Sequence, residues 1–129
     1  MAEDRVIEDY FNEISSVISS SQIIQSPEVA FDKRDVHIGA IRGDLALVDE
    51  SRLHLREYVN LEADPIRLKY AYHYQDAEGN FVLRYDNTPH YPELPNFPHH
   101  KHEQTETNVK PSNAPTLKDV LAEIELRIK

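Results

Sequence analysis

The fold is decided by residues 66–86, which read IRLKYAYHYQDAEGNFVLRYD. Apolar and aromatic residues recur at every second position on both sides of Asp76–Asn80, a pattern typical of β-strands. Gly79 stands where a short hairpin loop needs a left-handed backbone. We therefore expect a β-hairpin with antiparallel strands over 66–75 and 81–86.

The register of this hairpin determines which side chains share a face. Simple pairing across the turn puts Tyr72 opposite Arg84. Arg84 and Asp86 then lie on the face that carries Tyr70, Tyr72 and Tyr74, which we call the tyrosine stripe. Both faces would be partly apolar, which favours a central position in a covered sheet. The tyrosine stripe is more typical of sheet packing than of a base-stacking platform.

Working outward from the hairpin, the remaining chain predicts further strands and two terminal helices. Thr116 is a good N-cap for the last helix, with Asp119 as its capping-box partner. The expected elements are a helix over 4–19, strands over 29–31, 36–48 and 52–60, a short edge strand within 99–110, and a helix after residue 116. The fold class is α+β: a single antiparallel meander sheet with an N-terminal and a C-terminal helix packed on it. We expect one domain over residues 1–129.

Composition excludes several classes of function. The chain has 129 residues, no cysteine and a net charge of −9. Disulfides, thiolate metal sites and cysteine nucleophiles are excluded, and the acidic charge argues against strong nonspecific binding to nucleic acid. No run approaches the roughly 20 apolar residues of a membrane span, and the start of the chain lacks secretion-signal features. We expect a cytoplasmic protein with no membrane partner.

One stretch differs from the acidic remainder of the chain. Residues 84–102 carry two basic and two acidic side chains and four of the seven histidines. Anions would be repelled least here. The run 84–87, RYDN, and the run 97–102, FPHHKH, stand at its two ends.

These two runs, with Pro89-His90 and Pro92-Glu93-Leu94 between them, resemble the signature of the TumE-like toxin family. The resemblance covers roughly residues 35–128, and 97–102 is its most specific part. It implies a toxin component of a toxin–antitoxin system, held inactive by a cognate antitoxin protein encoded beside it. It assigns no catalytic residues.

The residues themselves suggest ribonuclease chemistry. Cleavage of RNA by its own 2′-hydroxyl needs a base, an acid and a cation for the phosphate, and histidine and arginine supply these. We expect a metal-independent endoribonuclease with RNA as substrate and no cofactor. The candidate catalytic residues are His90, His99, His100, His102, Arg56 and Arg84; the candidate substrate-binding residues are Lys101, Tyr85 and Tyr91.

Several alternatives stay open. His100 and His102 point the same way on an extended segment and could share a metal completed by Asp86 or His90, as in a metal hydrolase; a histidine-rich surface turn explains the spacing more simply. For Tyr85 a core position competes with base stacking, and Arg84 could simply pair with Asp86. A non-catalytic protein-binding or regulatory module is the competing class, and the acidic charge favours it. A homo-oligomer also stays open.

Glu57 stands out because it lies on the apolar face of the strand over 52–60. A buried carboxylate needs a partner, and a structural ion pair with an arginine, Arg42 or Arg84, is the expected explanation. A catalytic carboxylate with a perturbed pKa is the sharper alternative.

Overall fold

The computed structural model describes residues 5–128 and confirms the α+β class. Its elements in chain order are α1 (Ile7–Ser20), β1 (Ile24–Lys33), β2 (Ile38–Leu47), β3 (Arg52–Asn60), β4 (Arg67–Gln75), β5 (Phe81–Asp86), β6 (His100–Glu103), β7 (Val109–Pro111) and α2 (Leu117–Ile128). Within this described range, neither helix has the length and apolar character that a bilayer crossing requires.

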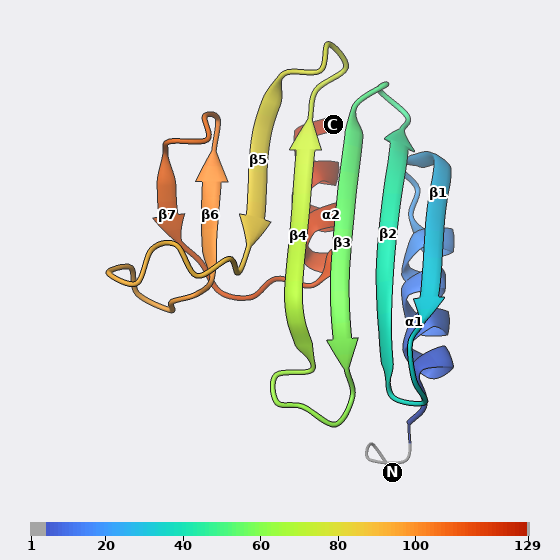
Figure 1. Ribbon diagram of the computed structural model, residues 1–129. Helices are drawn as coiled ribbons and strands as arrows, with labels where there is room; N and C mark the ends of the chain where they lie inside the picture. The colour runs from blue at the N-terminus through green and yellow to red at the C-terminus, as the bar shows by residue number, and fades with distance from the viewer. Residues whose placement is uncertain (1–4, 129) are drawn as a thin grey trace.

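The strands form one antiparallel meander in the order β1-β2-β3-β4-β5-β6-β7. Both helices lie on the same side of this sheet, α1 behind β1 and β2 and α2 behind β3 and β4 (Figure 1). The sheet thus has a helix face, which carries the core, and an open face. The cover on both faces that the hairpin sequence predicts is therefore wrong, because both helices pack on the same side of the sheet.

The core forms where the apolar stripes of both helices meet the helix face. Close approach of α1 depends on Gly39 of β2, because a Cβ there would lie 2.6 Å from Cζ of Phe11 and 2.7 Å from Cγ1 of Ile7. The predicted capping box of α2 is confirmed: the Asp119 amide donates to the Thr116 hydroxyl at 3.2 Å, and the Thr116 amide to the Asp119 carboxylate at 3.0 Å.

Element boundaries differ from the sequence expectation mainly at the sheet edges. β1 is ten residues long rather than three, although most of its residues are exposed. The expected single edge strand within 99–110 is two strands, β6 and β7. The helix expected from residue 4 begins at Ile7, and Asp4 itself lies outside the described residues.

The expected hairpin register is wrong, because β5 contains a bulge. Tyr74 pairs with Leu83 and Gln75 with Phe81, so Val82 is an extra residue on its strand. A slip of one residue moves every following side chain to the other face. Arg84 and Asp86 therefore lie on the open face, away from the tyrosine stripe.

Candidate functional site

Three buried polar side chains of β5 and β6 meet on the open face. Asp86 pairs with His100 across the two strands, and His102 lies two residues further along β6. The exposed fractions are 2% for Asp86, 2% for His100 and 5% for His102. His100 Nε2 lies 2.9 Å from Asp86 Oδ1, and His102 Nε2 lies 3.7 Å from Asp86 Oδ2. We call these three residues the Asp–His cluster.

The outer contacts of the cluster hold its side chains in place. Asp86 accepts hydrogen bonds from Arg84 Nε at 2.8 Å and from the Thr88 amide at 3.0 Å. His100 Nδ1 lies 3.0 Å from the carbonyl oxygen of Pro98, and His102 Nδ1 lies 2.7 Å from that of Glu106. Carbonyl oxygens only accept, so both Nδ1 atoms carry a proton. When the rings are neutral, both Nε2 lone pairs face the Asp86 carboxylate.

An aromatic side chain from the loop between β5 and β6 covers the cluster. The ring of Tyr91 packs edge to face on His100 and His102, with centroids 5.0 and 6.2 Å apart. His90 is exposed, and its ring centroid lies 6.4 Å from that of Tyr91. Access to the cluster therefore depends on Tyr91.

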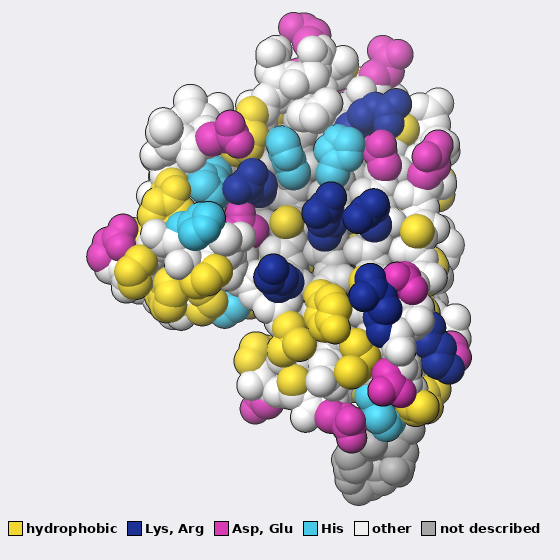
Figure 2. Space-filling model, in the orientation of Figure 1, with side chains coloured by type: hydrophobic (Ala, Val, Ile, Leu, Met, Phe, Trp, Pro, Cys, Tyr) yellow, Lys and Arg dark blue, Asp and Glu magenta, His cyan; other side chains and the backbone are white. Residues whose placement is uncertain are grey.

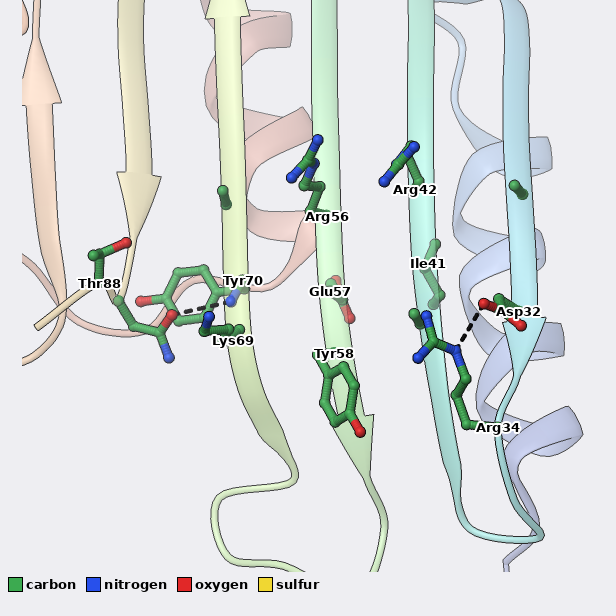
Figure 3. Close-up of a pocket in the computed structure, with 14 residues that line it drawn as sticks. Asp32, Arg34, Ile41, Arg42, Arg56, Glu57, Tyr58, Lys69, Tyr70 and Thr88 are labelled. Carbon is green, nitrogen blue, oxygen red and sulfur yellow. Dashed lines mark hydrogen bonds and ion pairs between the residues drawn. The ribbon is translucent and has the colours of Figure 1, made fainter.

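Beside the cluster, the open face carries a pocket of about 500 Å³, lined by side chains of β1 to β4 and by the start of the loop after β5. Ala30, Ala40 and Ala71 belong to this lining, and their short side chains leave it hollow. Its cations are Arg34, in the turn after β1, and Arg42, Arg56 and Lys69 along the middle strands. Figure 2 shows basic side chains gathered over this part of the open face, and Figure 3 shows these four residues around the pocket.

Arg42, Arg56 and Lys69 define what we call the basic groove. Among residues 5–128 none of the three forms an ion pair, while nearby Asp32 pairs with Arg34 at 2.7 Å. Arg42 and Arg56 lie directly opposite each other in the β2–β3 register. Like charges directly opposite destabilise a sheet, so this pair gains from an anion between them.

The basic groove and the Asp–His cluster are continuous. Thr88 lines the pocket, and its amide donates to Asp86. Ala71, also in the lining, is the cross-strand partner of Asp86. A phosphate chain lying along the groove would thus reach the edge of the cluster.

The structure separates the predicted site residues into two groups. His100, His102, Arg84 and Tyr91 come together around Asp86, and Arg56 lies in the groove beside them. Arg84 pairs with Asp86, as the simpler interpretation of these residues expected.

The remaining predicted residues lie elsewhere. Lys101 and Tyr85 lie on the helix face, where both hydrogen-bond Glu123 of α2, at 2.9 and 2.6 Å. Burial opposes the charge of Lys101, but hydrogen bonds to Glu103, Tyr85 and Glu123 raise its pKa above the usual value. His99 hydrogen-bonds the Tyr70 hydroxyl at 2.8 Å. Burial, followed by the nearby charge of Arg67, lowers the pKa of His99.

Glu57 is not paired with an arginine, and that prediction is wrong. It lies on the helix face, 3% exposed, whereas Arg42 and Arg84 extend from the open face. Its carboxylate accepts hydrogen bonds from the hydroxyls of Tyr10 and Tyr72, the latter at 2.5 Å. Burial, followed by the charge of Glu57, raises the pKa values of both phenols, which remain donors.

Sequence reasoning missed the groove cations Arg42 and Lys69. The signal was present in the alternation of their strands, which puts both on the polar face. The alternation does not give the strand order, which places β2, β3 and β4 side by side. The sequence indicates Asp86 only as an optional metal ligand and as a partner of Arg84.

Comparison with known proteins identifies the family of the chain. The family model described as Toxin TumE matches residues 14–128, which is most of the chain. The chain belongs to the TumE toxin family. The match includes all of β1 to β7 and α2, so the basic groove and the Asp–His cluster both lie within the TumE region. Searches of curated proteins and of solved structures found no significant match.

Proposed function

We propose that this TumE-family toxin acts by cleaving RNA and that a cognate antitoxin protein restrains it. One observation carries the proposal: three cations that form no ion pair within residues 5–128 line a groove that ends at a buried Asp–His cluster. Cations placed along a groove are what a phosphate backbone requires, and imidazoles beside a carboxylate are what phosphodiester cleavage requires.

Binding follows from the groove itself. Arg42, Arg56 and Lys69 would contact successive phosphates, and Tyr58, which lines the same pocket and is 36% exposed, offers a ring on which an unpaired base can stack. The local cations explain how a chain of net charge −9 can bind RNA.

Two routes of cleavage fit the cluster. In the metal-independent route expected from the sequence, one imidazole takes the 2′-hydroxyl proton and the 2′-oxygen attacks phosphorus. The bond to the 5′-oxygen breaks, and a second imidazole protonates that oxygen. The products are a 2′,3′-cyclic phosphate and a 5′-hydroxyl. A metal hydrolase would instead activate water and leave a linear phosphate end. End-group analysis of the cleaved RNA distinguishes the two.

The first test is colony survival after the chain is induced alone in a bacterium. A His100→Ala/His102→Ala double variant, produced at equal soluble level, should restore growth, and so should co-expression of the antitoxin. RNA from the killed cells should be cleaved. Killing without RNA cleavage would favour the non-catalytic binding module.

The groove has its own test in the salt dependence of RNA binding. Each phosphate contact on a single strand contributes about 0.7 to the slope of log K against log salt. Arg56→Ala should weaken binding and reduce that slope by about 0.7. The matched control, Lys118→Ala, removes an exposed cation of α2 on the other side of the sheet and should change neither value. Equal slopes for both variants would exclude the groove as the RNA site.

A further inference from the structure

We infer that Asp86, His100 and His102 form a binding site for one divalent transition-metal ion. Their ligand atoms all lie within 4.8 Å of one another. They come from directly paired positions on two adjacent strands, so the backbone holds them together. The inference that a metal ion binds here is drawn from geometry alone. The use of that ion in RNA cleavage rests on the proposed function.

The hydrogen bonds of the two rings favour a cation at the centre of the cluster. Both Nδ1 atoms donate to backbone carbonyls, so the neutral rings direct unprotonated Nε2 atoms at the carboxylate of Asp86. The two Nε2 lone pairs and the negative charge of the Asp86 carboxylate repel one another. A metal ion bonded to both Nε2 atoms and to the carboxylate converts this repulsion into three coordinate bonds.

Protonation of the rings explains the arrangement less well. A protonated His100 would satisfy its contact with Asp86 at 2.9 Å. His102 Nε2 would still be unsatisfied, because this atom is fully buried and has no hydrogen-bond partner among the described residues. Protonating both rings would put two cations and Arg84 around one buried carboxylate.

The distances suit a metal of the size of Zn²⁺. Two ligands each 2.0–2.1 Å from a tetrahedral ion are about 3.3 Å apart. The separations from Nε2 to carboxylate oxygen, 2.9 Å for His100 and 3.7 Å for His102, lie on either side of that value. These two separations are therefore within a few tenths of an ångström of bonding geometry, and all three ligand atoms lie within 4.8 Å of one another.

The surroundings are those of a metal site. Metal-ligating histidines almost always donate their second ring N–H to a carbonyl or carboxylate, and ligating carboxylates are themselves hydrogen-bonded. Pro98 and Glu106 supply those carbonyls, and Arg84 and Thr88 bind the carboxylate. Two imidazoles and one carboxylate favour Zn²⁺, Fe²⁺, Mn²⁺ or Ni²⁺ over Ca²⁺ or Mg²⁺, and leave a position free for water or phosphate.

The test uses the full chain after treatment with a chelator and its removal. Zn²⁺ and Mn²⁺ are titrated by calorimetry, and bound metal is counted by elemental analysis. We expect one equivalent per chain. His102→Gln should weaken Zn²⁺ binding at least tenfold. The control variant His54→Gln should not weaken it; His54 lies on β3, with its ring centroid 6.0 Å from that of His73. Loss of binding in His54→Gln alone would place the metal at that pair and overturn the inference.

A spectroscopic measurement on the unchanged chain keeps the test independent of variant folding. Imidazole ¹⁵N spectra should show the Nε2 signals of His100 and His102 shifting at one equivalent of Zn²⁺, with those of His54 and His73 unchanged. No shift would refute the site. RNA cleavage is scored separately. Metal binding without cleavage would overturn the proposed function alone, and full cleavage by a chain that binds no metal would overturn the metal site alone.

Discussion

Replacing Tyr10 with phenylalanine should destabilise the protein by about 2 kcal/mol. Tyr10 is 6% exposed and its hydroxyl donates to Glu57, which is 3% exposed. Hydrogen bonds to charged groups contribute about 1.5–3 kcal/mol, and burial of both partners prevents water from replacing the lost donor. Phenylalanine keeps the ring and its packing, so no cavity term is added. The loss falls on the contact that joins α1 to β3.

Urea unfolding measures this cost, with an unchanged m-value as the sign that only stability has changed. A double-mutant cycle with Glu57→Gln isolates the Tyr10–Glu57 contact, and we expect a coupling free energy above about 1 kcal/mol. Tyr58→Phe is the matched control. Tyr58 follows Glu57 on β3 but points to the open face, 36% exposed, and its substitution should stay within about 0.5 kcal/mol. A cost for Tyr10→Phe as small as that of the control would refute the reasoning.

Two further predictions concern packing and pH. Gly39→Ala should cost about 1–3 kcal/mol in urea unfolding, because the new Cβ would lie 2.6 Å from the rigid ring of Phe11; no loss would mean that α1 can move away. Burial, followed by the charges of His54 and Arg84, lowers the pKa of His73. The unfolded chain therefore binds the proton more readily, and the stability present above about pH 6.5 should fall as the pH drops below it. His73→Gln should lessen that acid loss in urea unfolding at pH 7 and pH 5, and an identical loss in both proteins would assign it to other groups.

Much of the fold could be predicted from local patterns. The alternation over 52–60 and 81–86 predicts both strands with correct bounds, because a period of two is a local property of the chain. Thr116 and Asp119 mark the start of α2 through contacts three residues apart. The long edge strand β1 was largely missed, since its exposed residues carry little hydrophobic signal.

The candidate site was predicted only in part, for a physical reason. The i, i+2 spacing of His100 and His102 correctly indicates two side chains on the same side of one strand. Their partner Asp86 depends on the bulge at Val82, which turns the end of β5 to the open face. The bulge is a property of the pairing between β4 and β5, so the alternation of β5 by itself does not reveal it.

The sequence by itself determined most of the secondary structure, the capping box of α2 and the segment that carries the histidines, because these follow from neighbours a few residues apart. Only the tertiary structure decided which side chains from different elements contact one another. It brought Arg42, Arg56 and Lys69 side by side from three strands, gave Glu57 two phenols in place of an arginine, and put Asp86 between two histidines. Each of these contacts is set by the strand order, the register and the side of the sheet that the helices cover, and these emerge only when the whole chain packs.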